Sequence, residues 1–258
     1  MTFRELHDGE QPLVLPNAWD VPSALAFLDV GFAAIGTTSF GVASSLGRPD
    51  GARSTRDANV ALAHDLSRLP CYITMDIEDG YADEPELVAE YVAGLDVAGI
   101  NIEDSTAERL ISPVAFAAKV AAIKRRCPDL FVNARVDTYW LGEDATVTSS
   151  LERATAYVDA GADGVFVPGA VEPAVLRELA RNIAVPLNVL VVPGLSLNEL
   201  GELGVRRVST GSLPYRAAIH SAVGVASGVR DGRAIPASTP YPELQARLVR
   251  YEQSAGEE

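Results

Sequence analysis

The sequence has 258 residues, of which 48% are hydrophobic and 22% are charged, a composition typical of a globular protein with a sizeable core. Its formal net charge of −14 argues against nucleic acids and anionic membranes as partners, because both would repel it. No apolar run reaches the roughly 18 residues that a membrane span needs, and Cys71 and Cys127 do not make a disulfide framework. We therefore expect a cytoplasmic protein.

Apolar and amphipathic stretches alternate along the chain. In FLDVGFAAIGTT, LDVAGINIEDS, YVDAGADGVFVPG and LGELGVRRVSTG, the pattern predicts a helix that ends at a glycine, followed two or three residues later by a strand. The glycines are Gly31, Gly99, Gly161 and Gly204, and glycine suits the left-handed position after a helix. The runs LVLPNAW, CYITMD, FVNAR and LNVLVV supply four further strands. The sequence thus predicts eight strands that alternate with helices.

Capping signals place helix starts at Ser112-Pro113, at Glu172-Pro173 and at Ser196. No long linker or low-complexity segment divides the chain. This alternation predicts the α/β class and a (β/α)8 TIM barrel, as a single domain over residues 1–258. A doubly wound sheet is the weaker alternative. The tail from about residue 230 is predicted to form a C-terminal extension with one additional helix.

Barrel topology assigns a place to each polar residue, because active sites of this fold lie at the C-terminal ends of the strands. Acidic residues end the third and fourth strands, and Arg135 ends the fifth, which indicates a site for a divalent metal and an anion. Hard oxygen ligands favour magnesium or manganese over zinc. For Asp104 and Asp137, a structural role in helix capping or ion pairing is as consistent with the sequence as a role in the site. The strand-end residues that we single out are Asn17, Asp20, Thr37, Thr38, Ser39, Asp76, Glu78, Glu103, Asp104, Arg135, Asp137, Asn188, Thr210, Gly211 and Ser212.

The scarcity of other reactive groups narrows the chemistry. The only lysines, Lys119 and Lys124, lie in the helix predicted after the fourth strand, whereas a Schiff-base aldolase needs a desolvated lysine on a strand. The three histidines fall in predicted helices, where we expect surface or packing roles. The reaction is therefore expected to depend on a metal, carboxylates, hydroxyls and Arg135.

An ordered set of motifs carries a family resemblance. LPNAWDVPSA, DIEDGY, INIEDS, NARVDTY, DAGADGVFVPG and PLNVLV, between about Leu13 and Ser212, resemble the isocitrate lyase and phosphoenolpyruvate mutase superfamily. The resemblance implies a magnesium-dependent barrel that acts on 2-oxo acids or their phosphorylated relatives. Such enzymes make or break a C–C or P–C bond through a metal-bound enolate.

The resemblance also implies roles for individual residues. Asp76 corresponds to the main metal ligand, and Asp50, Glu78 and Glu103 to ligands that act mostly through metal-held waters. The substrate would be bound by Thr37, Thr38, Ser39, Asn188 and Arg135. We expect the catalytic residues to be Arg135, Glu103 and Tyr81, with Tyr81 or a metal-bound water as the acid that protonates the enolate.

Departures from the family pattern favour some activities over others. The loop EDSTAERLISP, a predicted lid, lacks the cysteine of the lyases and the lysine of the mutase, and VPGA replaces the glutamate or histidine that follows their sixth strand. A magnesium-dependent lyase or decarboxylase for a small 2-oxo diacid fits best. The alternatives are a phosphonopyruvate-type mutase or hydrolase, a class II pyruvate aldolase-like enzyme, and a non-catalytic oxo-acid-binding barrel. The expected partners are a small carboxylate and further copies of the chain, as a dimer or tetramer.

Overall fold

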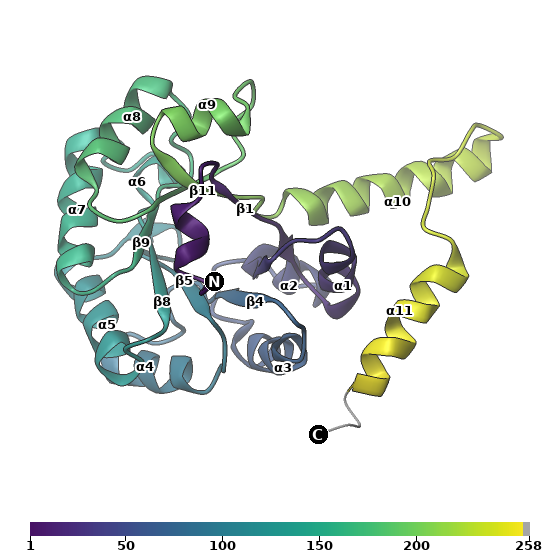
Figure 1. Cartoon of the computed structure of the whole chain (residues 1–258), viewed down its shortest axis with the longest axis horizontal. Helices are drawn as coiled ribbons and strands as arrows, with labels where there is room; N and C mark the ends of the chain where they lie inside the picture. Colours follow the sequence, from purple (N-terminus) through teal and green to yellow (C-terminus); the bar gives the residue numbers. More distant parts are fainter. Residues whose placement is uncertain (255–258) are drawn as a thin grey trace.

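The computed structural model describes residues 1–254, which fold into the predicted barrel of parallel strands with helices outside it (Figure 1). β1 pairs with β11 and β2 pairs with β3, and only Pro16 separates β1 from β2. This stretch joins the two ends of the sheet, so the doubly wound alternative is wrong. The barrel strands are β1 (Leu13–Leu15), β2 (Asn17–Ala18), β3 (Ala34–Thr37), β4 (Tyr72–Asp76), β5 (Gly99–Glu103), β8 (Phe131–Arg135), β9 (Gly164–Phe166), β10 (Leu187–Leu190) and β11 (Val205–Ser209).

Helices follow the strands, and the three predicted helix starts are confirmed. Pro113 and Pro173 each open a helix, and the Ser196 side chain accepts a hydrogen bond from the backbone N–H of Glu199. Such a cap satisfies a backbone donor that has no partner within the helix. The helices around the barrel are α1 (Val21–Asp29), α2 (Ser39–Ser45), α3 (Arg56–Ser67), α4 (Pro85–Ala93), α5 (Pro113–Arg126), α6 (Thr138–Leu141), α7 (Val147–Asp159), α8 (Pro173–Asn182) and α9 (Leu197–Glu202).

The predicted glycines behave in two ways. Gly31, Gly161 and Gly204 follow helices with φ of 92°, 105° and 97°, a region where only glycine is unstrained. The prediction for Gly99 is wrong, because this residue opens β5 instead of ending α4. A Cβ there would lie 2.9 Å from the Phe131 carbonyl oxygen, so close strand packing explains this glycine.

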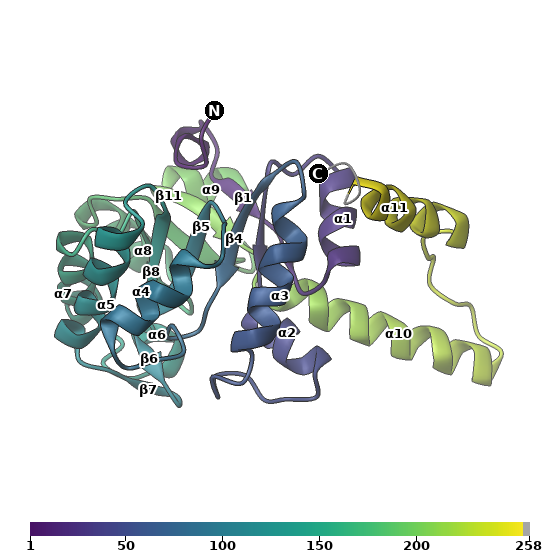
Figure 2. The ribbon, with the colours of Figure 1, turned by 90° about the horizontal axis from the view of Figure 1, so that it is seen from below.

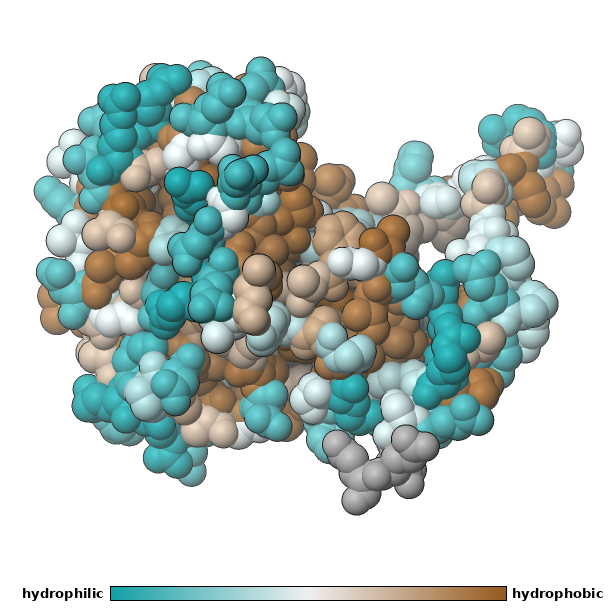
Figure 3. Space-filling view, in the orientation of Figure 1, coloured by the Kyte–Doolittle hydropathy of each residue, from teal (hydrophilic) through white to brown (hydrophobic). Residues whose placement is uncertain are grey.

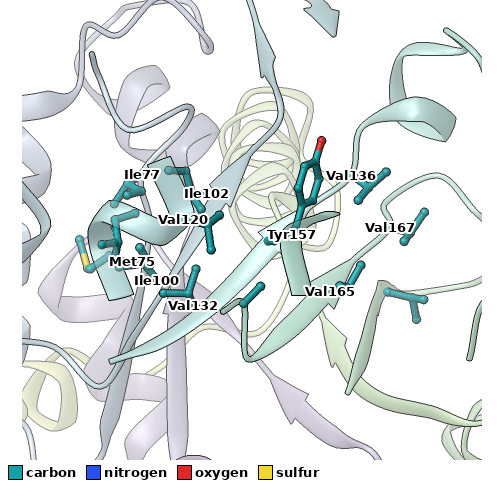
Figure 4. Packing of buried hydrophobic residues seen from close by; sticks show 14 of the residues in the cluster. Met75, Ile77, Ile100, Ile102, Val120, Val132, Val136, Tyr157, Val165 and Val167 are labelled. Carbon is teal, nitrogen blue, oxygen red and sulfur yellow. The ribbon is translucent and has the colours of Figure 1, made fainter. Parts of the chain in front are cut away.

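The main core lies between the strands and the helices. Buried residues of neighbouring strands, such as Met75, Ile100, Val132 and Val165, belong to one continuous cluster (Figure 4). Alternate residues of the same strands point into the barrel, as the period of two requires.

The N-terminal segment packs at the end of the barrel opposite the expected site. It contains the short 3-10 helix η1 (Glu5–Asp8), whose buried His7 ring stacks on Phe131 at 4.5 Å between centroids. Figure 2 shows the N-terminus at one end of the barrel, with α2 and the hairpin of β6 (Ser105–Thr106) and β7 (Arg109–Leu110) at the other. The barrel end that carries these loops is therefore the one that can hold a site.

Two C-terminal helices form an arm. α10 (Leu213–Asp231) projects away from the barrel, and α11 (Tyr241–Ser254), the predicted additional helix, returns toward α1 and α3 (Figure 1). The Tyr251 hydroxyl donates to the Asp65 carbonyl oxygen at 3.0 Å. Figure 3 shows hydrophobic residues at the surface beside the base of this arm. Within residues 1–254, no helix has both the length and the apolar character needed to cross a membrane.

Candidate active site

A cavity of about 360 Å³ opens at the C-terminal ends of the barrel strands. Its polar lining includes the predicted residues Thr37, Thr38, Ser39, Asp76 and Arg135, together with Asp50 from the loop after α2. Its apolar lining includes Trp140, Phe166, Pro168 and Leu190. The Arg135 guanidinium lies 5.6 Å from the centroid of the Trp140 ring and 5.9 Å from that of Phe166.

Two carboxylates share the cavity. Asp76 ends β4, and its Oδ2 accepts a hydrogen bond of 3.1 Å from the Ser39 backbone N–H. Asp50 lies at the exposed mouth, yet loss of hydration, and then the Asp76 charge, raise its pKa above the ordinary value. A bound cation would offset this effect of the Asp76 charge on Asp50.

Arg135 is held in a fixed orientation by two carboxylates. Its Nη1 lies 2.8 Å from Glu103 Oε2, and its Nε lies 2.6 Å from Asp137 Oδ1. Burial raises the pKa of Glu103 well above its usual range, and the Arg135 charge opposes that rise. Since a guanidinium has five N–H donors, Arg135 keeps others for a ligand in the cavity.

Glu78 is not among the residues that line the cavity. Its backbone has φ of 51°, and its carboxylate accepts hydrogen bonds from Thr55 Oγ1 at 2.5 Å and from the Arg53 backbone N–H at 2.8 Å. Burial raises the pKa of Glu78, and the charges of Asp50 and Asp76 add to that rise. Among residues 1–254, no three histidine, cysteine or acidic side chains form a group that could hold a metal.

Tyr81 lies on the outside of the barrel. Its hydroxyl is 3.0 Å from Thr55 Oγ1, and its ring lines an open groove of about 560 Å³ between α3 and α4. This groove is larger than the cavity, but Asp76 and Arg135 are not among its lining residues. Burial strongly raises the pKa of the Tyr81 hydroxyl. Tyr81 is not among the residues that line the cavity, and its hydroxyl already contacts Thr55 and Asn59, so we favour another group as the acid.

The predicted substrate-binding residues have different surroundings. Thr38 and Ser39 line the cavity, but their backbone N–H groups already donate to the Ala18 carbonyl and to Asp76. Asn188 is not on the cavity wall. It lies behind Ser209, whose hydroxyl donates to Asn188 Oδ1 at 3.2 Å.

Asp104, which had two interpretations, is structural. It is buried, and its carboxylate accepts hydrogen bonds from Arg153 at 2.9 Å, from the Tyr157 hydroxyl at 2.6 Å and from the Asp137 backbone N–H at 2.8 Å. These contacts fix the position of Asp137 and hence of Arg135.

Two arginines were missed by the sequence analysis. Arg216, in the first turns of α10, lines the cavity mouth. Arg207 is 1% exposed and lies beneath the floor, where it donates to Asn101 and Ser209, both of which line the cavity. The sequence VRRVS contains a signal for Arg207. Two neighbouring residues of a strand point to opposite faces, so one of the two arginines must point inward.

Comparisons with known proteins identify the family of the chain. A family model described as phosphoenolpyruvate phosphomutase matches residues 3–230. An uncharacterized protein of Mycobacterium tuberculosis is 63% identical over 252 residues, which cover 98% of each chain. The oxaloacetate decarboxylase of Pseudomonas fluorescens is 32% identical over 238 residues, which cover 84% of this chain and 80% of that enzyme.

A solved structure shares the fold. A phosphonopyruvate hydrolase in complex with oxalate and Mg²⁺ superposes with a TM-score of 0.81 at 23% identity, over 99% of each chain. The family match covers most of the chain and includes all the strands described above. The chain therefore belongs to the phosphoenolpyruvate mutase and isocitrate lyase superfamily of lyases and mutases, as its ordered motifs predicted.

Proposed function

We propose that the chain is a magnesium- or manganese-dependent lyase that cleaves a carbon–carbon bond of a small 2-oxo acid or a related di- or tricarboxylate. The observation that supports this most directly is that Asp50, Asp76 and Arg135 all line a single cavity. Two negative groups that suit a cation thus lie beside a fixed cation that suits an anion. The name of the Pseudomonas fluorescens relative, oxaloacetate decarboxylase, supports a small oxo diacid as substrate.

A divalent metal fits the residues present. Mg²⁺ commonly keeps several waters and needs only one or two protein carboxylates, which Asp76 and Asp50 would supply. When bound, the metal would polarise the keto oxygen of the substrate and lower the energy of the charge that develops there. Glu78 is too firmly bound to Thr55 and Arg53 to be a necessary ligand.

The remaining roles fall to groups that the structure already orients. Arg135 would donate to the oxygen on which negative charge develops, and its two ion pairs hold it there at little reorganisation cost. Glu103 is not itself a lining residue, but it lies 2.8 Å from Arg135, which lines the cavity, and its pKa is raised by burial. We therefore propose Glu103 for proton transfer in place of Tyr81. Apolar residues of the cavity lining, such as Phe166 and Leu190, would exclude water from the reacting atoms.

We also propose that the chain acts as a homo-oligomer. Of the residues in α10, only Gly228 is buried, while Leu213, Ile219, Val223 and Val229 are exposed by 45%, 52%, 64% and 69%. A long helix with this many exposed apolar side chains is typical of an association surface.

A substrate panel tests the proposed activity. Oxaloacetate and substituted 2-oxo and 2-hydroxy diacids should be screened with Mg²⁺ for release of pyruvate, another 2-oxo acid or carbon dioxide, with Asp76→Asn as the inactive control. Turnover of phosphonopyruvate alone would favour the mutase or hydrolase alternative, and release of pyruvate only from aldol adducts would favour the aldolase alternative. Metal-dependent binding of oxo acids without any turnover would contradict a lyase.

A further inference from the structure

Asp79 is an acidic residue of the DIEDGY motif that the proposed function does not use. It is 2% exposed, and neither Asp79 nor its side-chain partners Arg53 and Thr106 are among the residues that line the cavity. Its two carboxylate oxygens accept hydrogen bonds from Arg53 Nε at 2.9 and 2.8 Å, and its Oδ2 accepts one from Thr106 Oγ1 at 2.6 Å. One buried carboxylate therefore binds two separate segments.

Both segments lie at the end of the barrel where the cavity opens (Figure 2), and we call them the rim segments. Arg53 belongs to the loop between α2 and α3, and the same loop places Asp50 on the cavity wall. Thr106 belongs to β6, in the hairpin that follows β5. Figure 2 shows this loop and this hairpin at the same end of the barrel.

The backbone around Asp79 is held in an uncommon conformation. Arg53 and Glu78 have φ of 55° and 51°, and a left-handed conformation costs a non-glycine residue about 1 kcal/mol. Glu78 adds a second attachment, since its carboxylate accepts from the Arg53 backbone N–H at 2.8 Å. These contacts offset the cost and fix the loop that carries Asp50.

Lys119 is a second buried cation in contact with Asp79. This lysine is 3% exposed, its Nζ donates to the Asp79 carbonyl oxygen at 2.8 Å, and it lies 3.9 Å from Asp79 Oδ2. A buried carboxylate between two cations is strongly retained in place, because removing one partner leaves an uncompensated charge. Arg53 also pairs with Asp83 at 2.5 Å, but that carboxylate is 86% exposed and its contribution is expected to be small.

We propose that Asp79 is a positioning residue that clasps both rim segments at once and, through Arg53, keeps Asp50 at the cavity. The proposal deepens the proposed function, because it assigns to Asp79 a role in maintaining the metal site. The two rim segments are coupled: loss of the shared carboxylate releases both, whereas loss of one donor releases only its own segment.

Hydrogen exchange of the metal-free, full-length protein tests the clasp independently of any metal. Asp79→Asn should speed exchange at least tenfold in peptides that cover residues 47–55 and 105–110. Arg53→Gln should do so only in the first peptide and Thr106→Val only in the second, while Asp83→Asn, the matched control, should change neither. Exchange at the rate of the unaltered protein in both peptides of Asp79→Asn would overturn the proposal. If Asp79→Asn does not fold, the two donor variants decide, and unchanged exchange in both would overturn it.

Mn²⁺ affinity, measured by electron paramagnetic resonance, supplies the functional readout. Asp79→Asn and Arg53→Gln should bind Mn²⁺ at least fivefold more weakly than Asp83→Asn, at unchanged circular dichroism. Equal affinities in all three variants would show that the clasp does not position Asp50. Failure of the unaltered protein to bind Mn²⁺ would instead contradict the proposed function, which the exchange experiment does not depend on.

Discussion

Arg207 Nη2 donates a hydrogen bond of 3.1 Å to Asn101 Oδ1, so a buried guanidinium lies directly beneath a residue that lines the cavity. No ion pair between Arg207 and a carboxylate is found in the described part of the chain, residues 1–254. Burial lowers the pKa of Arg207 to about 9, and the Asp76 charge opposes that change. A buried cation without a paired anion is unfavourable for folding but favours an anion bound above it.

Arg207→Met should therefore weaken anion binding without lowering the stability of the fold. We expect thermal stability to be unchanged or higher, because an apolar side chain of similar length avoids burying a charge. Oxalate affinity in the presence of Mg²⁺ should fall about tenfold or more, as measured by calorimetry. Arg206→Met, at the exposed neighbouring position of the same strand, is the matched control and should leave affinity unchanged. If Arg207→Met binds oxalate as tightly as Arg206→Met, Arg207 does not contribute to anion binding.

Arg135→Lys tests whether the reaction needs the planar guanidinium group with its fixed set of N–H donors. Lysine keeps the charge but cannot contact Glu103, Asp137 and a ligand at once, as the guanidinium geometry allows. Turnover should fall about a hundredfold, the typical effect of losing one oriented donor at a developing charge, in a steady-state assay with the active substrate. Activity within about twofold of the unaltered protein would place Arg135 outside the reaction.

His7 predicts a specific pH dependence of stability. Burial, and then the Arg207 charge, lower the pKa of His7 to about 4, below its ordinary value of about 6.5. Because the folded state binds the proton less tightly than the unfolded state, the stabilisation is complete above about pH 6.5 and is lost progressively toward pH 4. Between pH 7 and pH 5 the loss amounts to about 2 kcal/mol.

The measurement is the free energy of unfolding in urea at both pH values, for the unaltered protein and for His7→Gln. The glutamine variant cannot titrate at this position, so the difference between the two proteins should shrink as the pH falls. A difference that stays constant would show that the two states bind the proton equally at His7.

The exposed face of α10 predicts self-association. Light scattering of the purified protein should show a dimer or tetramer, and Val223→Asp should shift it toward the monomer, because a charge would be buried in the contact. Glu202→Asp, on α9 and outside the arm, is the control. A monomer at every concentration tested would contradict the proposed association.

Some of the site could be predicted from the sequence and some could not. Asp76 and Arg135 were found because a strand-end residue must point into the mouth of a barrel once its strand is known. Glu78 and Tyr81 are two and five residues beyond Asp76, and both have left-handed backbones with φ of 51° and 61°. Such conformations are rare without glycine, so no sequence pattern indicated that these side chains do not line the cavity.

The fold was easier to predict than the contacts of single side chains. Alternating apolar runs identified all the barrel strands, since each must be covered on both sides. The position of Arg216 depends on where α10 leaves the barrel, a tertiary feature that periodicity does not contain. Gly99 was misassigned because close packing and helix termination require the same residue type.

The most direct test of the central claim is the metal dependence of oxalate binding, measured by calorimetry with Mg²⁺ and with a chelator. Oxalate mimics the enolate of pyruvate, so we expect tight binding with Mg²⁺, binding at least a hundredfold weaker with the chelator, and loss of the metal effect in Asp76→Asn. That variant keeps an oxygen that can accept from the Ser39 N–H, so its fold should be retained. Oxalate binding of equal strength with and without Mg²⁺, or an unchanged metal effect in Asp76→Asn, would contradict the account.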